Sequence, residues 1–293
     1  MTMTQNNFDG TNPRRSLLFV PAVKLELIEK ANRSGADVIC IDLEDSVSDK
    51  EKEAMRTEAI SHIKKIIKNK SNNVQEIWLR INSLRTVAGL EDILALNKFG
   101  IFPHGLMLPK ITSPEEVRIL RDVISNQKSG VTFHPLIETS EGLKNAYKIS
   151  KISHKIGSLV FGGFDMAANL RIEPSWNGLL FARQQLVLAA ASARIDLLDM
   201  PNFELDNLED LKNETTAARQ IGFTGKCAIH PKQVAIINEI FSPSDQEIEK
   251  AKNLIKKYEE QDKAFVKIDG ILMEKPVLQR LYRTLAIAKR IGS

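Results

Sequence analysis

Carboxylate side chains recur where short apolar runs end, and these positions are the first candidates for chemistry. Residues 132–138 form an apolar run that ends in Glu138, and residues 158–163 form a second run that is soon followed by Asp165. Parallel strands of an α/β fold present their carboxyl ends at one edge, so Glu138 and Asp165 are expected to lie close together. Two carboxylates there suit a hard divalent cation such as Mg²⁺. The alternative is that each carboxylate caps the helix that follows it.

A second acidic group, Asp42-Leu-Glu44-Asp45, follows the apolar run 38–41. Alternation along a strand directs Asp42 and Glu44 to the same face. On that face Glu44 is a candidate base or a residue that orients bound water. The alternative is that Asp45 alone matters, as a helix cap.

Arg80 lies within the strand-like run 76–82. Burying a guanidinium group without an anion is costly, so an anionic partner is expected. A substrate carboxylate held by a bidentate pair is one candidate. The other is an internal salt bridge to the acids at positions 42–45.

Lys110 ends the run 105–110 and is a candidate substrate-binding residue. A lysine at such a place forms a Schiff base in metal-free aldolases when desolvation lowers its pKa. The two acids available for a metal favour metal-assisted chemistry instead.

The glycine pair before Asp165 frees the backbone for close approach. The N–H groups of this segment, including Gly163, could cradle a small carboxylate, or the pair could simply make a tight turn. Phe164 and residues 106–110 are expected to set the size of the substrate side group. His134 and His230 border prolines, and Cys40 and Cys227 lie in apolar runs; a role in the core is expected for all four.

Eight apolar runs alternate with helical patterns and must position these side chains. They are residues 16–21, 38–44, 76–82, 105–110, 132–138, 158–163, 193–199 and 225–231. Short strands without alternation, separated by helices, indicate a parallel sheet covered on both faces. Eight of them favour a closed TIM-type (β/α)8 barrel. Its active-site end would carry the residues above together with Asp199 and the segment around His230.

Composition narrows the function classes. The 293 residues are 43% hydrophobic and carry a net charge of only +4, which is spread along the chain. This balance does not favour nucleic-acid binding. No apolar run approaches the length of a membrane span, and the polar N-terminus lacks the apolar centre of a signal peptide. A cytoplasmic protein without membrane or nucleic-acid partners is expected.

The chain is expected to divide into three parts. Residues 1–13 are a loose N-terminal tail, residues 14–255 form the barrel, and residues 256–293 form a C-terminal extension. The extension contains a helix and a hairpin-like segment, 264–273, with Asp269-Gly270 as its turn. Because the barrel does not need this extension for closure, it is expected to pack on a neighbouring subunit.

The motifs together resemble the citrate lyase beta subunit family, the acyl-CoA lyases of the HpcH/HpaI aldolase/citrate lyase superfamily. The resemblance runs from about Arg15 to the C-terminus. Its motifs are Arg15-Ser-Leu-Leu-Phe-Val-Pro21, residues 34–47, Leu79-Arg-Ile-Asn82, Leu108-Pro-Lys110, Leu136-Ile-Glu-Thr139, Phe161-Gly-Gly-Phe-Asp165 and Gly225-Lys-Cys-Ala-Ile-His-Pro231.

The resemblance implies a barrel, usually trimeric, that cleaves or forms a carbon–carbon bond beside a CoA or acyl-carrier thioester. Glu138 and Asp165 correspond to Mg²⁺ ligands, and Arg80 to the residue that holds the oxoacid carboxylate. The segment Ile229-His230-Pro231 is similar to the edge along which CoA lies. These assignments agree with the chemistry of the residue types.

Two positions depart from the family pattern. Phe164 stands where the family usually has glutamate, and Glu274 stands where the family has its catalytic aspartate. The resemblance implies a Mg²⁺-dependent lyase that cleaves a malyl-CoA or citramalyl-CoA type substrate to acetyl-CoA and a 2-oxoacid. Glu274 of a neighbouring subunit would transfer the proton. Alternatives are a citryl-thioester lyase subunit with an acyl carrier protein partner, or a regulatory homologue with weak activity.

Overall fold

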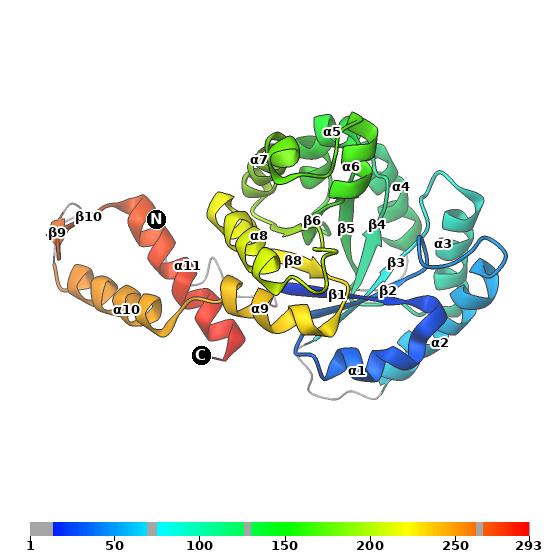
Figure 1. The fold of residues 1–293 in the computed structure, drawn as a ribbon, viewed down its shortest axis with the longest axis horizontal. Helices are drawn as coiled ribbons and strands as arrows, with labels where there is room; N and C mark the ends of the chain where they lie inside the picture. Colours follow the sequence, from blue (N-terminus) through cyan, green and yellow to red (C-terminus); the bar gives the residue numbers. More distant parts are fainter. Residues whose placement is uncertain (1–13, 69–74, 126–129, 262–265, 293) are drawn as a thin grey trace. The chain divides into compact units, whose positions relative to one another are not determined.

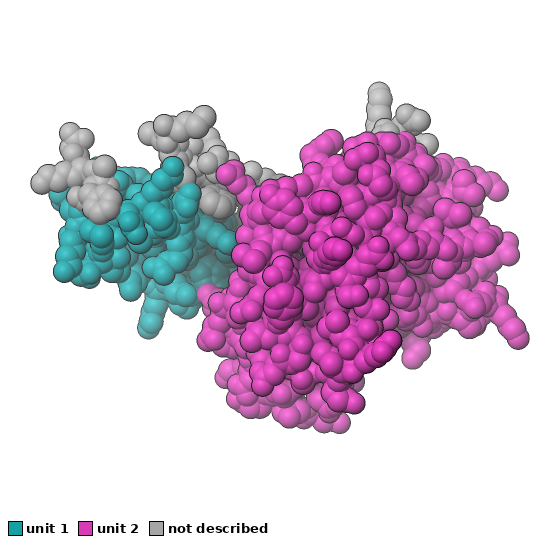
Figure 2. Space-filling model, turned by 90° about the horizontal axis from the view of Figure 1, so that it is seen from above, with its two compact units in different colours: residues 1–13, 239–293 teal, residues 14–238 magenta. Residues whose placement is uncertain are grey.

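The computed structural model of the protein describes residues 14–68, 75–125, 130–261 and 266–292. The predicted tail, residues 1–13, lies outside the described residues. The chain divides into two compact units, residues 14–238 and residues 239–293 (Figure 2). The predicted end of the barrel at residue 255 falls inside a helix of the second unit, α10 (Asp245–Glu259).

The first unit is a closed barrel of eight parallel strands surrounded by helices (Figure 1), which confirms the predicted fold class. The strands are β1 (Ser16–Pro21), β2 (Val38–Asp42), β3 (Glu76–Arg80), β4 (Gly105–Leu108), β5 (Thr132–Ile137), β6 (Ser158–Phe161), β7 (Asp196–Asp199) and β8 (Gly225–Ala228). Each strand pairs with the next along the chain. Pairing of Leu17 with Cys227 joins β1 to β8 and completes the ring.

The helices of this unit connect successive strands, except the last one, which follows β8 and extends across the boundary between the units. They are η2 (Ala22–Leu27), α1 (Ile28–Asn32), α2 (Lys52–Lys68), α3 (Val87–Phe99), α4 (Pro114–Ser125), α5 (Ser140–Lys151), α6 (Gly163–Leu170), α7 (Trp176–Ala193), α8 (Leu208–Ile221) and α9 (Pro231–Phe241). Local signals set several of their ends: Thr86, Thr139 and Ser175 each accept a capping hydrogen bond. In the part of the chain that the structure describes, no helix is long and apolar enough to cross a membrane.

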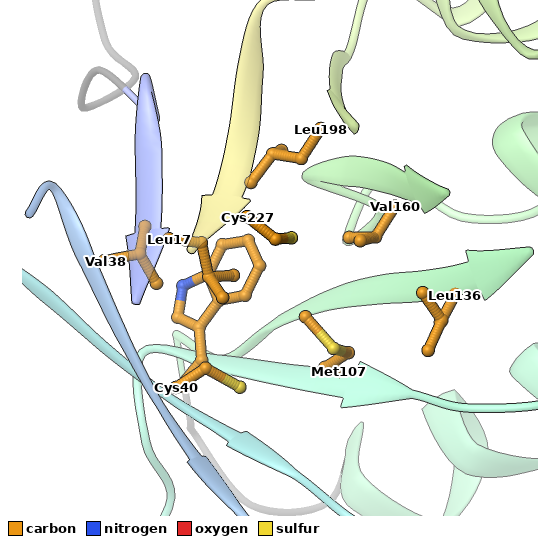
Figure 3. Packing of buried hydrophobic residues seen from close by; sticks show 9 residues of the cluster. Leu17, Val38, Cys40, Met107, Leu136, Val160, Leu198 and Cys227 are labelled. Atoms are coloured by element: carbon orange, nitrogen blue, oxygen red, sulfur yellow. The ribbon is translucent and has the colours of Figure 1, made fainter. Parts of the chain in front are cut away.

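A cluster of buried side chains drawn from all eight strands forms the centre of the barrel (Figure 3). Its members are Leu17, Val38, Cys40, Trp78, Met107, Leu136, Val160, Leu198 and Cys227. Both cysteines are free and fully buried, as predicted. Burial raises the pKa of the Cys227 thiol to about 12 and that of Cys40 well above its ordinary value. Neither thiol is therefore a nucleophile at neutral pH.

His134 packs against this cluster through Trp78. Its ring stacks on Trp78 with 3.4 Å between centroids and is hydrogen-bonded to Ser158 Oγ and Thr132 Oγ1, each at 2.8 Å. Burial, with the charge of Arg14, lowers its pKa well below the usual value. His134 is thus a neutral core residue, as expected.

The second unit has a small core of its own, formed by residues that include Ala251, Leu254, Met273 and Leu281. Its elements are α10, β9 (Val266–Ile268), β10 (Ile271–Met273) and α11 (Lys275–Ile291). The two strands pair antiparallel. Asp269 and Gly270 both have positive φ, 47° and 80°, as a tight hairpin turn requires. The predicted hairpin is confirmed from residue 266 onward.

Candidate active site

The candidate site lies at the C-terminal ends of β2 to β6, here called the rim. Glu138 follows β5 directly and is buried. Its Oε1 accepts a hydrogen bond of 2.6 Å from the backbone N–H of Lys110. A Cβ at Gly162 would lie 2.5 Å from Glu138 Cβ and 2.7 Å from its Oε2. Glycine at position 162 therefore leaves the room that the Glu138 carboxyl group occupies.

Asp165 lies in the first turn of α6 and is exposed. The pKa of Glu138 is raised to about 8, mainly by burial and also by the negative charges of Glu44 and Asp165. The charges of Glu138 and Asp165 are therefore close enough to interact, as their strand-end positions predicted. A carboxyl group held neutral by burial and by like charges gains a strong tendency to bind a cation.

Arg80, at the end of β3, is engaged by acids of the β2 segment. Its Nε and Nη2 donate to Oδ1 and Oδ2 of Asp42 at 2.7 and 2.8 Å. Its Nη1 lies 3.1 Å from Glu44 Oε2 and 3.1 Å from Asp45 Oδ2. The internal salt bridge is thus formed, whereas the role of Arg80 toward a substrate carboxylate stays a prediction.

The electrostatics of this fork differ between its two buried acids. Burial acts against ionisation of Asp42, but the hydrogen bonds and charge of Arg80 outweigh it and lower the pKa of Asp42. Burial dominates at Glu44 and raises its pKa despite Arg80. Asp45 is the most exposed partner, with 60% of its side chain accessible. Among the three acids, Asp45 therefore loses the least burial if it separates from Arg80.

Lys110 follows β4 and touches two of the acids. Its Nζ lies 2.8 Å from Glu44 Oε1, and contact with Glu44 raises its pKa. A Schiff-base lysine needs the opposite shift. The geometry therefore agrees with the sequence-based preference against Schiff-base chemistry at this residue.

The glycine and aromatic residues beside Asp165 lie between β6 and β7. A Cβ at Gly163 would meet Met200 Sδ at 2.0 Å, so a larger residue there would require the Met200 side chain to move. The ring of Phe164 packs edge-on against Phe203, with 4.4 Å between centroids, and both rings are exposed. A substrate-binding role for Gly163 and Phe164 stays a prediction.

The segment Ile229-His230-Pro231 joins β8 to α9. The side chain of Gln233 accepts hydrogen bonds from the N–H groups of Ile229 and His230 at 2.9 and 3.3 Å. His230 Nδ1 accepts one from the N–H of Lys232 at 3.2 Å. These residues are half-buried, and their role toward CoA stays a prediction.

Two sequence-predicted residues are not part of this group. Glu274 belongs to the other unit, where it immediately precedes α11 and makes no capping hydrogen bond within the described part of the chain. Asp199 was expected at the active-site end, but it is fully buried and paired with Arg183 and Lys226 at 3.0 and 2.8 Å. Asp199 does end β7, as expected, but its side chain points away from the barrel centre, where the side chain of its neighbour Leu198 packs.

Sequence reasoning anticipated one contact of the rim and missed another. A salt bridge between Arg80 and the acids at positions 42–45 was one of the expected alternatives, and Asp45 takes part in it. The hydrogen bond from the Lys110 backbone to Glu138 depends on a positive φ of 55° at Lys110. A lysine in the sequence gives no signal of such a backbone conformation, so this hydrogen bond could not be predicted.

The residues present fit a Mg²⁺ ion. Five carboxyl groups lie at the rim, those of Asp42, Glu44, Asp45, Glu138 and Asp165, and Arg80 and Lys110 form ion pairs with three of them. Within the described ranges, no three His, Cys, Asp or Glu side chains form a complete metal site. Mg²⁺ is commonly held by one or two carboxylates, with water and substrate as its other ligands. Glu138 and Asp165 are carboxyl groups of this kind, and their role as metal ligands stays a prediction.

A family profile described as HpcH/HpaI aldolase/citrate lyase matches residues 15–231. The chain is also 30% identical over 298 residues to a Homo sapiens protein named citramalyl-CoA lyase, mitochondrial. That alignment covers 95% of this chain and 86% of the human protein.

Solved structures show the same fold. RipC from Yersinia pestis is 38% identical, with a TM-score of 0.70 over 80% of this chain and 97% of that one. A citrate lyase beta subunit from M. tuberculosis, solved with oxaloacetate and magnesium, is 26% identical. Its TM-score is 0.66 over 81% of this chain and 100% of that one.

Proposed function

Because the chain belongs to the HpcH/HpaI aldolase/citrate lyase family, we propose that it is a Mg²⁺-dependent lyase acting on a 3-hydroxy-dicarboxylic acyl-CoA of the malyl-CoA or citramalyl-CoA type. The products are acetyl-CoA and a 2-oxoacid. The family description and the human relative's name both refer to lyases, which confirms the prediction of a carbon–carbon lyase. Metal and substrate are the proposed part.

The observation that carries the proposal is the electrostatic interaction between Glu138, which follows β5, and Asp165, which follows β6, on a rim rich in acids. Burial and neighbouring charges hold the pKa of Glu138 at about 8. A divalent cation relieves that repulsion, and carboxylate oxygens are its preferred ligands. The magnesium in the M. tuberculosis relative and the CoA ester in the human relative's name support the same assignment.

Each residue of the rim has a defined task in this reaction. Glu138 and Asp165 hold the Mg²⁺, which when bound stabilises negative charge on the substrate oxygens. Arg80 orients the substrate carboxylate, exchanging its exposed partner Asp45 for it. Glu44 lies within reach of both Arg80 and Lys110. It is placed to orient a proton-bearing group beside them.

Two further groups complete the proposal. Ile229, His230 and Pro231 line the edge along which CoA lies, and Phe164 limits the side group of the substrate. Glu274 transfers the proton at the acetyl carbon and acts from a neighbouring subunit of a homotrimer in the cytoplasm. Loss of such a proton-transfer group typically lowers the rate by about 10² to 10⁴.

A turnover assay on the purified protein tests this function. Malyl-CoA, citramalyl-CoA and citryl-CoA are offered with Mg²⁺ and again with a chelator, and release of acetyl-CoA is followed. Mg²⁺-dependent cleavage by the wild type and none by Glu138→Gln is the expected result. Cleavage in the presence of the chelator would contradict the metal assignment. Failure to cleave any of the three esters would contradict the proposed lyase reaction.

The similarity to a citrate lyase beta subunit favours a second candidate, a citryl-thioester lyase subunit whose substrate is borne by an acyl carrier protein. The same assay with citryl-carrier thioester in place of the CoA esters separates the two. Binding of Mg²⁺ and CoA without turnover of any thioester would instead identify a regulatory homologue, in which Glu274 does not replace the family aspartate.

A further inference from the structure

The backbone of Lys110 adopts a conformation that its side chain does not favour. Its φ is +55°, in the left-handed region, where residues other than glycine, asparagine and aspartate are rarely found. Such a conformation persists only when surrounding contacts impose it. Lys110 lies in the turn directly after β4 and contacts two acids of the rim, Glu44 and Glu138.

Contacts on two sides hold this residue. Its backbone N–H donates to Glu138 Oε1 at 2.6 Å. Its Nζ reaches Glu44 Oε1 at 2.8 Å, while the other oxygen of Glu44 lies 3.1 Å from Arg80 Nη1. Glu44 is buried, and neither of its oxygens accepts a well-aligned hydrogen bond from the residues described. The ion pairs of Glu44 with Lys110 and Arg80 therefore compensate for the burial of its carboxyl group.

We propose that Lys110 is a positioning residue for Glu138. The left-handed backbone turns the N–H onto Oε1, the ion pair with Glu44 anchors the side chain, and Gly162 leaves room for Oε2. Glu138 is thereby fixed in one rotamer before any cation arrives. This inference rests on the proposed role of Glu138 as a Mg²⁺ ligand, and it gives Lys110 no covalent step.

Substitutions that differ in backbone preference separate this role from that of the ammonium group. Lys110→Gly and Lys110→Asn lose the ammonium group but accept a positive φ, whereas Lys110→Ala loses it and resists that φ. Mg²⁺ affinity of the full chain is measured by calorimetry. We expect Lys110→Ala to bind Mg²⁺ on the order of tenfold more weakly than Lys110→Gly, with Lys110→Asn close to Lys110→Gly.

Arg194 offers a matched control, because it has a φ of 58° at the C-terminal end of α7, outside the rim. Arg194→Gly and Arg194→Ala should differ in melting temperature but share one Mg²⁺ affinity. Equal Mg²⁺ affinity across the three Lys110 variants would overturn the positioning role.

Glu138→Gln in the same series distinguishes failure of the inference from failure of the metal site. If Glu138→Gln loses Mg²⁺ while the Lys110 variants bind alike, only the role of Lys110 is wrong. If Glu138→Gln binds Mg²⁺ as the wild type does, or the wild type binds none, the metal site is wrong and the positioning role falls with it.

Discussion

Glu138 shows how one carboxyl group can oppose folding and still be essential for binding. Its pKa is about 4.3 in an unfolded chain and about 8 in the folded protein without metal. Between these values the unfolded chain ionises while the folded protein must keep the proton. The contribution of Glu138 to stability is therefore full below about pH 4 and is lost as the pH rises to about 8.

Glu138→Gln keeps an acceptor for the Lys110 N–H but cannot ionise. We expect the metal-free variant to melt at a higher temperature than the wild type near pH 8 and at a similar one near pH 4. Added Mg²⁺ should raise the melting temperature of the wild type only, and more strongly as the pH increases. A variant that is less stable than the wild type at both pH values would contradict this assignment.

Arg80 tests whether the fork at the rim recognises substrate as well as its own acids. Arg80→Lys keeps the charge but loses the bidentate geometry. Binding of the 2-oxoacid in the presence of Mg²⁺ should weaken about tenfold or more, as measured by calorimetry. Asp45→Asn, which removes the exposed competitor, should bind the oxoacid at least as tightly as the wild type. Unchanged affinity in Arg80→Lys would leave the arginine a structural role.

The sequence predicted the position of individual site residues where a charged or acidic residue type occurred at the end of a predicted strand. Glu138, Asp165 and Arg80 were placed by their location at strand ends, and the structure brings the first two within electrostatic reach. The sequence could not reveal which acids form ion pairs with Arg80, because Asp42, Glu44 and Asp45 all lie within a few residues of one another. That choice depends on how the backbone turns after β2.

Among the elements, β7, β8, α7 and α8 share a buried ionic layer. Asp199 on β7 pairs with Arg183 on α7 and Lys226 on β8, and Lys226 also lies 3.0 Å from Glu214 on α8. Arg183 and Lys226 are fully buried. The layer crosslinks strands to helices at the part of the barrel where the ring closes.

Asp199→Ala would leave two buried cations with Glu214 as their remaining acidic partner. Removing one member of a buried ion network typically costs about 3 to 5 kcal/mol. We expect a loss of that size in the free energy of unfolding, measured with urea. Asp206→Ala is the control, since Asp206 pairs with Lys232 in solvent and its loss should cost less than about 1 kcal/mol. Similar losses in the two variants would argue against a structural role for the layer.

The order of strands and helices was predictable because parallel strands buried on both faces have continuous apolar sequences. All eight predicted runs contain a strand. The short helix α6 and the direction of Asp199 were not predictable in this way. Helix α6 has only eight residues and begins with glycine. A strand that is buried on both faces has no apolar–polar alternation in its sequence to indicate which face its last side chain takes.

Residues 239–293 form a separate unit with its own core. Glu274 belongs to this unit. If Glu274 acts on the barrel of a neighbouring subunit, an inactive Glu274→Ala chain and an inactive Asp165→Asn chain should complement each other when co-assembled. Partial recovery of turnover is expected, because some interfaces then combine an intact rim with an intact Glu274. Mixed assemblies without activity would show that each barrel depends on its own C-terminal unit.

Closure of the barrel by β1 and β8 also constrains how the protein is made. Strand β1 begins at Ser16, yet its partner β8 begins only at Gly225. The edge of β1 that pairs with β8 therefore stays unpaired until about 200 further residues have been synthesised. At 5 to 20 residues per second this is roughly 10 to 40 s during which the nascent sheet has two unpaired edges. Residues 239–293 are synthesised after β8, so β8 can pair with β1 while the chain is still being elongated. The ring can thus close before the polypeptide is released.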